Sequence, residues 1–169
     1  MQTATQDRIL GLAPCEGEAL WWFNGLATLK VTGEQSGGLF SLIEILYPAG
    51  GMVPRHVHHR EDELFYLIDG ELEMRIGERT IKAKPGTTLY APRDIPHGFQ
   101  VGPKEPVHYL ILYTPAGFEG FIRDTSRPAH RLTLPPPPDA PPTPAQMEAI
   151  GEMMRQRYGC EWATDFSAT

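Results

Sequence analysis

Histidines and a carboxylate gather between residues 50 and 70, and they constrain the fold more than any other part of the chain. Three of the six histidines stand at positions 56, 58 and 59. In a β-strand, side chains two residues apart point to the same face, so His56 and His58 can reach one point while Val57 faces away. Glu63 opens the apolar run 64–68 and can return beside them on a neighbouring strand. Two neutral imidazoles and a carboxylate are a ligand set for a first-row divalent metal.

A second stretch, residues 84–100, has a Pro-Gly turn, a short strand, a Pro-rich turn and a lone histidine. The two stretches together resemble the two signatures of the cupin superfamily. In the first, spacings of five, one, four and six residues separate Gly50, His56, His58, Glu63 and Gly70. In the second, five residues separate Gly86 from Pro92, and His97 follows. Two positions depart from the family pattern: Asp94 replaces a frequent glycine, and Val101 a frequent asparagine.

The resemblance implies an all-β fold, a single cupin barrel (a double-stranded β-helix or jelly roll) followed by a short C-terminal helix. It also implies one divalent transition metal per chain, held by His56, His58, Glu63 and His97. Fe, Ni, Co, Mn, Cu and Zn all suit three imidazoles and a carboxylate, and ligand type does not choose among them. Four protein ligands leave room for water, substrate or oxygen at the metal.

Four further runs make the chain similar to small bacterial single-barrel cupins of the quercetin 2,3-dioxygenase type: residues 20–25, 37–40, 56–63 and 114–119. That likeness implies an enzyme that opens the heterocycle of a flavonol with O2 and releases carbon monoxide. Glu63 would then be catalytic, accepting the proton of the substrate's 3-hydroxyl as well as binding the metal. Two alternatives stay open. One is a non-oxidative metal-dependent isomerase or lyase, which Arg55 or Arg93 could serve; the other is a non-catalytic ligand-binding barrel.

Strand parity predicts a largely apolar and aromatic substrate pocket beside the metal. The residues expected to line it are Phe40, Leu42, Met52, Phe65, Leu67, Phe99, Tyr109 and Ile111. Each of them is equally compatible with simply filling a small barrel. Outside the ligand set, His59 has the wrong parity and is expected to face outward. Glu61 and Asp62 are expected in a solvated turn, and His108 is expected to be packed rather than to ligate.

The composition bounds the class of protein. The chain has 169 residues, 41% hydrophobic and 21% charged, with a formal net charge of −6. This acidic balance disfavours nucleic acid and anionic membrane surfaces as partners. A small-molecule substrate and O2 are the partners that the resemblance implies. The N-terminus lacks a signal-peptide pattern, and no apolar run reaches the roughly 18–20 residues of a membrane span, so a cytoplasmic location is expected. Cys15 and Cys160 are then expected to be reduced.

Turn residues and periodicity divide the chain into a leader (1–17), the barrel (18–115), a short helix (116–124), a Pro-rich strap (125–142) and a C-terminal helix (143–159). Within the barrel, Asn24-Gly25, Asp69-Gly70 and Gly77-Glu78 predict hairpin turns, and residues 33–38 a polar loop. Thr143-Pro144 and Gly159 predict the ends of the last helix. The leader, the tryptophans and this helix make a homodimer plausible.

Overall fold

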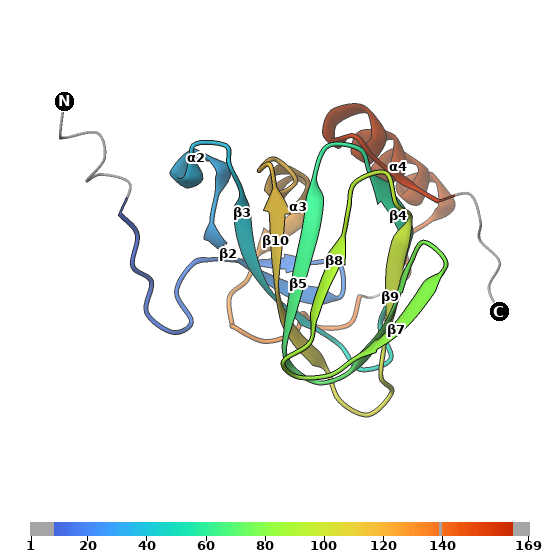
Figure 1. Ribbon diagram of the computed structural model, residues 1–169, viewed down its shortest axis with the longest axis horizontal. Helices are drawn as coiled ribbons and strands as arrows, with labels where there is room; N and C mark the ends of the chain where they lie inside the picture. The colour runs from blue at the N-terminus through green and yellow to red at the C-terminus, as the bar shows by residue number, and fades with distance from the viewer. Residues whose placement is uncertain (1–8, 139, 164–169) are drawn as a thin grey trace.

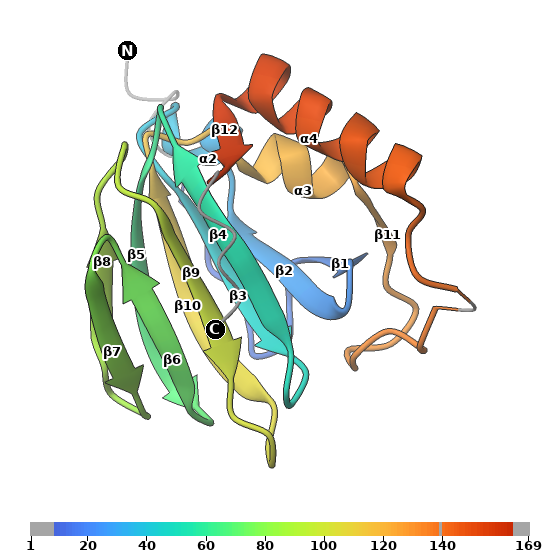
Figure 2. The same ribbon diagram turned by 90° about the vertical axis from the view of Figure 1, so that its right-hand side faces the viewer.

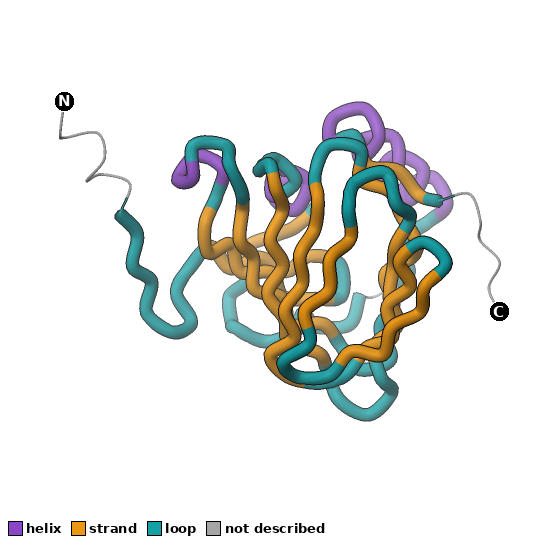
Figure 3. The backbone as a smooth tube through the Cα atoms, viewed as in Figure 1, coloured by secondary structure: helices purple, strands orange, loops and turns teal. Residues whose placement is uncertain are grey.

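The computed structural model describes residues 9–138 and 140–163 (Figure 1). The first eight residues of the predicted leader and residue 139 of the predicted strap lie outside these ranges. Strands dominate the described chain (Figure 3). They are β1 Glu18–Trp22, β2 Gly25–Val31, β3 Ser41–Tyr47, β4 Met52–His58, β5 Asp62–Asp69, β6 Leu72–Ile76, β7 Arg79–Ala83, β8 Thr88–Ala91, β9 His97–Val101, β10 Val107–Thr114, β11 Ser126–Pro128 and β12 Cys160–Trp162.

Within the described residues, the strands form a seven-stranded sheet, β11-β1-β2-β3-β10-β5-β8, and a five-stranded sheet, β12-β4-β9-β6-β7. All of their pairings are antiparallel. From β3 to β10 the chain passes repeatedly between the sheets, which is the jelly-roll arrangement. The predicted all-β jelly roll is therefore confirmed.

The predicted hairpin at Asp69-Gly70 is wrong. β5 pairs with β8 and β10, whereas β6 pairs with β7 and β9, so this turn carries the chain from one sheet to the other. Gly70 has a φ of 76°, and a Cβ there would lie 2.3 Å from the Pro106 carbonyl oxygen. The same turn chemistry serves a hairpin and a crossing between sheets, so the dipeptide does not distinguish them.

The turn predicted at Asn24-Gly25 lies one residue earlier. Trp22 pairs with Gly25, which makes Phe23 and Asn24 the two loop residues between β1 and β2. Gly25 is instead a strand residue under close packing: a Cβ there would lie 2.8 Å from the Tyr47 ring and 3.1 Å from the Leu46 carbonyl oxygen. Glycine is therefore required at position 25 by close packing and not by the turn, and Phe23 has the left-handed φ of 50° in the turn.

Three helices accompany the sheets in the described chain: α2 Gly33–Ser36, α3 Glu119–Asp124 and α4 Pro144–Tyr158. α2 replaces the polar loop expected at 33–38, because Thr32 and Gln35 form a capping box. α4 begins after Thr143, whose hydroxyl accepts from the Gln146 amide, and ends at Gly159 with a φ of 63°. Figure 2 shows α3 and α4 side by side at one end of the barrel.

The C-terminal chain returns to the barrel after α4, which the sequence did not indicate. β12 pairs with the edge of β4, placing Cys160 opposite His58 and Trp162 opposite His56. β11, inside the Pro-rich strap, pairs with β1 in the same way at the other sheet. Cys15 is exposed and Cys160 buried, and both are free thiols. No helix in the described ranges is long and apolar enough to cross a membrane.

Candidate metal centre

Both sheets contribute to a cluster of four side chains. β4 carries His56 and His58, β9 carries His97 and β5 of the opposite sheet carries Glu63. One potential ligand atom from each lies within 4.8 Å of the others. The structure thus brings together the four residues predicted as metal ligands. His58, Glu63 and His97 are each 1% exposed, so a cation bound there would exchange water for protein ligands.

The outward ring nitrogens of the three histidines each have a partner. Nδ1 of His56 lies 2.9 Å from the Pro54 carbonyl oxygen, and Nδ1 of His97 lies 2.9 Å from that of Ile95. Nδ1 of His58 lies 3.3 Å from Oε2 of Glu61. A proton on each Nδ1 satisfies these acceptors and leaves each Nε2 lone pair free to ligate.

The inward atoms fit a metal better than they fit one another. Nε2 of His58 lies 2.9 Å from Oε1 of Glu63, and Nε2 of His97 lies 2.9 Å from Oε2 of Glu63. The contact between His58 and Glu63 does not have the geometry of a hydrogen bond. Nε2 of His58 is therefore a buried nitrogen without a hydrogen-bond partner among the described residues. Converging nitrogen and oxygen donors of this kind suit a first-row divalent metal. The residues present therefore fit the cofactor that the sequence predicted.

The electrostatics favour the ligating forms of two of these groups. Burial lowers the pKa of His56 to about 3, and the neighbouring His97 and His58 act in the same direction. Burial alone would raise the pKa of Glu63, but His58 and His97 outweigh it and hold that pKa well below its usual range. His56 is therefore neutral and Glu63 ionised at neutral pH. For His58, burial opposes the proton, yet Glu63, Cys160 and Glu61 raise its pKa well above normal.

Sequence reasoning missed Glu61. Expected in a solvated turn, Glu61 is 3% exposed and lies beneath His58. Its neighbour Asp62 begins β5 and forms an ion pair with Arg93, with 2.9 Å between Oδ1 and Nε. The two adjacent carboxylates therefore differ in their surroundings: Glu61 is buried next to His58, whereas Asp62 pairs with Arg93. A carboxylate three residues after a ligand histidine was the available signal, but a surface turn carries the same pattern.

Other histidines lie where the sequence placed them, outside the ligand set. His59 faces outward, with Nδ1 2.6 Å from Oδ1 of Asp94. Asp94 itself has a φ of 64°, which explains why glycine is frequent at this position, since Asp tolerates the left-handed region better than most residues. His108 is packed against Glu44, with 2.7 Å between Nε2 and Oε1.

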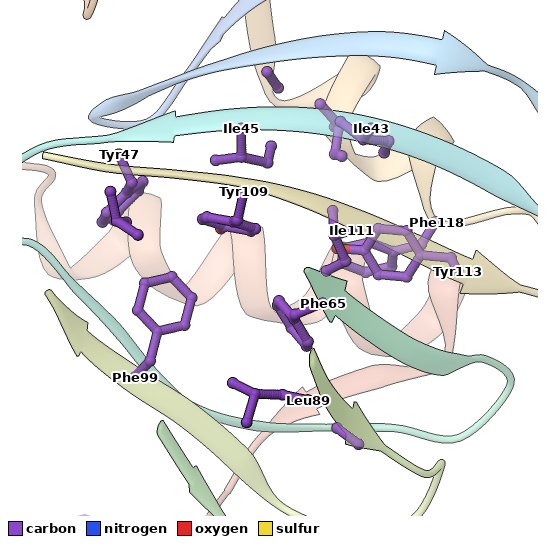
Figure 4. Close-up of a cluster of buried hydrophobic side chains, with 14 of the residues drawn as sticks. Ile43, Ile45, Tyr47, Phe65, Leu89, Phe99, Tyr109, Ile111, Tyr113 and Phe118 are labelled. Atoms are coloured by element: carbon purple, nitrogen blue, oxygen red, sulfur yellow. The ribbon is translucent and has the colours of Figure 1, made fainter. Parts of the chain in front are cut away.

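A cavity of about 210 Å3 adjoins the cluster, and His56, Glu63 and His97 form part of its wall. Aromatic and aliphatic side chains form most of the remainder. β5, β9 and β10 contribute Phe65, Phe99, Tyr109, Ile111 and Tyr113. The strands β1 and β12 and the segments of α3 and α4 contribute Trp22, Trp162, Phe118, Phe121 and Met154. Figure 4 shows Phe65, Phe99 and Tyr109 converging in the space between the sheets. Burial raises the pKa of Tyr109 and Tyr113 well above normal, so both hydroxyls stay protonated.

Four of the eight predicted pocket residues line this cavity: Phe65, Phe99, Tyr109 and Ile111. Phe40, Leu42, Met52 and Leu67 do not. Phe40 precedes β3, and Leu42 has the outward parity, since its neighbours Ser41 and Ile43 are both buried. Leu67 is fully buried in the core beyond the cavity.

Met52 was misplaced by a β-bulge. β4 pairs Val53 with Phe99 and His56 with His97, so β4 has one residue more than β9 in this interval. The extra residue reverses the alternation of faces. Met52 is therefore 56% exposed, whereas Val53 and Pro54 join His56 at the cavity. Pro54 suits this interval because it has no amide to leave unpaired.

Comparison with known families matches residues 43–113 to the cupin domain. Among curated proteins, quercetin 2,3-dioxygenase of Bacillus subtilis is 25% identical over 128 residues, which cover 74% of this chain and 37% of the relative. The chain spans between 37% and 60% of the length of the curated relatives that it matches.

Solved structures share the fold. An RmlC-like cupin from Shewanella frigidimarina gives a TM-score of 0.56 at 13% identity, over 66% of this chain and 96% of the other. The polyketide cyclase RemF from Streptomyces resistomycificus gives 0.55 at 20% identity, over 63% and 79%. At these identities the likeness concerns the fold alone.

Proposed function

The chain belongs to the cupin superfamily, and on that premise we propose that it is a metal-dependent dioxygenase. Its substrates in this proposal are O2 and a flavonol-like or other small aromatic compound that can enolise. The sequence likeness to a quercetin 2,3-dioxygenase supports this choice of reaction.

The observation that carries the proposal is the chemistry of the cavity wall. Among the described residues that line the cavity, none is Lys or Arg. Arg55 donates to the carbonyl oxygen of Gly77, and Arg93 pairs with Asp62. Apart from a bound metal, a small polar acid entering this apolar space would lose hydration without gaining a cationic side chain as partner. The lining therefore favours an aromatic substrate over the acids of the non-oxidative alternative.

Glu63 is the residue suited to general base catalysis. Its carboxylate is buried and ionised, and it lies in the cavity wall. In the proposed reaction Glu63 accepts the proton of the substrate hydroxyl, which leaves an enolate next to the histidines. His56, His58 and His97 would hold the metal together with Glu63, and the bound metal would supply Lewis-acid and oxygen chemistry.

The aromatic walls would position the substrate ring. Phe65, Phe99 and Tyr109 line the space beside Glu63, with interplanar angles of 42° between Phe65 and Tyr109 and 84° between Phe99 and Tyr109, so a planar ligand would meet both ring faces and ring edges. Phe118 and Met154 line the cavity on the side of α3 and α4 and are 3% and 2% exposed, so in this proposal they would limit the access of water from that side.

Oxygen uptake tests the proposal. Protein reconstituted separately with Fe, Ni, Co, Mn and Cu would be mixed with quercetin in an oxygen electrode, with an anaerobic run beside it. We expect equimolar loss of O2 and flavonol, abolished in Glu63→Gln and retained in Asp62→Asn, a change at the adjacent surface carboxylate. Protein that holds metal but consumes no oxygen with any of these ions would overturn the dioxygenase and leave isomerase, lyase or binding roles.

We also propose that the chain forms a homodimer through the outer face of the seven-stranded sheet. The strand register aligns Leu42, Leu112, Leu64 and Tyr90 in one row across β3, β10, β5 and β8. Leu64, Tyr66, Ile68 and Tyr90 are 40–54% exposed. β5 is thus apolar on both faces, a pattern typical of strands covered on both sides.

A second copy suits this face because the charges at its rim are already paired. Arg93 forms an ion pair with Asp62, and Lys30 forms one with Glu44. Two copies could therefore meet without repulsion between unpaired like charges. The apolar centre of this face is four strands wide, at about 4.8 Å per strand, and five residues long, at about 3.4 Å per residue. Its area is therefore roughly 300 Å2. With a polar rim, such a centre can support an interface of about 800 Å2 per subunit.

Light scattering after gel filtration checks the dimer. Tyr66→Glu should give a monomer, whereas Met52→Glu, which changes an exposed apolar residue on the other sheet, should keep the wild-type mass. A wild-type monomer at micromolar concentration would refute the proposed interface.

A further inference from the structure

The mouth of the cavity can be located from residues that both line it and reach solvent. Phe23 is 40% exposed and Met147 is 37% exposed, and both belong to the cavity wall. Residues deeper in the wall, such as Phe121 and Met154, are 2% exposed. Asn24, beside Phe23 in the β1–β2 turn, is also exposed and lines the cavity. The mouth therefore lies between the β1–β2 turn and the first turn of α4.

Phe23 occupies its place at a conformational cost. Its φ of 50° lies in the left-handed region, which a bulky side chain rarely adopts. The ring packs near Trp22 and Phe121, with centroid separations of 5.4 and 6.5 Å. Strained residues of this kind persist where the surrounding structure holds them, and they cluster at ligand clamps. Glycine at this position would remove both the strain and the ring.

Met147 lies on the lightly packed half of α4. From Pro144 to Ala149 the helix is exposed, and its packing begins at Ile150. The far end is anchored by Met154, by Tyr158 bonded to Asp124 and by the pairing of β12 with β4. The N-terminal half can therefore move away from Phe23 without breaking those anchors.

The cavity is small for the substrate class proposed above. Its volume of about 210 Å3 falls below the roughly 300–1,000 Å3 of typical ligand pockets. A three-ring flavonol therefore needs additional space, and Phe23 and Met147 stand where that space would open.

We propose that Phe23 and Met147 form a size-selective gate, which admits bicyclic ligands in the closed form and three-ring ligands after Met147 has moved aside. The gate rests on the proposed function, because it takes the cavity as the substrate site.

Association rates test the gate without using catalysis. The probes are 2-naphthol, with two rings, and quercetin, with three, added to chelator-treated protein so that no metal contributes. Trp22 and Trp162 line the cavity, so quenching of tryptophan fluorescence in stopped flow reports binding. Phe23→Gly and Met147→Ala should speed quercetin association by about tenfold, as lowering the barrier by about 1.4 kcal/mol would. The association rate of 2-naphthol should change less than twofold in both variants.

Two controls separate a gate from a packing residue. Ile95, which is also 37% exposed, does not line the cavity, so Ile95→Ala should leave both rates unchanged. Phe23→Gly should keep its unfolding midpoint, since the strain removed offsets the lost contacts. A lowered midpoint with unchanged rates would overturn the gate and make Phe23 a core residue. If neither probe binds the wild type with or without metal, the cavity is not a ligand site and the proposed function falls with the gate. Unchanged rates beside intact oxygen uptake remove the gate alone.

Discussion

Glu61 should control metal affinity although it is not a ligand. Its Oε2 lies 3.3 Å from Nδ1 of His58, and the two side chains are 4% and 1% exposed. A hydrogen bond to a charged group contributes about 1.5–3 kcal/mol. Because 3.3 Å exceeds the roughly 2.7–2.9 Å typical of charge-assisted bonds, we take the lower half of that range. Glu61→Ala should therefore weaken metal binding about 12- to 40-fold. Glu61→Gln keeps an acceptor but loses the charge, and should weaken binding about fivefold.

Competition between the protein and a chelator for Co2+, followed by the visible absorption of the bound ion, measures this affinity. Asp62→Asn is the matched control, because it alters the adjacent carboxylate on the outward side of the chain. Circular dichroism and the unfolding midpoint of the metal-free protein establish that each variant is folded. A folded Glu61→Ala protein that binds Co2+ within twofold of the wild type would refute the inference that Glu61 positions His58.

Three further predictions concern stability. Arg93 lowers the pKa of Asp62 to about 2, so the folded-state pKa is depressed and the pair stabilises the protein above the unfolded value near 4. Because the pair is partly exposed, its contribution to the free energy of unfolding is limited to about 1 kcal/mol. In urea unfolding, the free-energy difference between wild type and Asp62→Asn should shrink as pH falls from about 4 to 2. A difference that stays constant over this range would contradict the prediction. Gly25→Ala places a Cβ 2.8 Å from the Tyr47 ring and should cost about 1–3 kcal/mol in the same assay. Gly11→Ala, with no atom within 4 Å, should cost almost nothing, and equal effects would count against the packing argument. Adding metal at about 100 times its Kd should stabilise the folded protein by about 2.7 kcal/mol, which chelation reverses; an unchanged midpoint in differential scanning calorimetry would mean that the cluster binds no metal.

The sequence predicted the barrel and the four clustered residues because both depend on local patterns. Short strands separated by turn residues predict a sandwich or barrel, and the resemblance to the cupins implied the jelly roll. The spacing of His56 and His58 places both on one face of β4. Parity also identified the cavity residues Phe65, Phe99, Tyr109 and Ile111. The parity argument failed at Met52, because an extra residue in β4 reverses which side chains face the cavity, and the sequence contains no pattern that predicts this bulge.

Contacts distant in sequence decided the rest. Glu61 is buried where the chain at Gly117 approaches it, since a Cβ at Gly117 would lie 3.6 Å from Oε1 of Glu61, and the position of Phe23 depends on Tyr47 packing against Gly25. The Pro-rich segment and α4 could be predicted as separate pieces, but the pairing of β12 with β4 could not. The sequence by itself thus determined the barrel and the four residues of the candidate metal cluster, since strand period and turn chemistry act over a few residues. Only the tertiary structure decided the bulge, the buried carboxylate and the lining of the cavity, because each depends on packing between segments far apart in the chain.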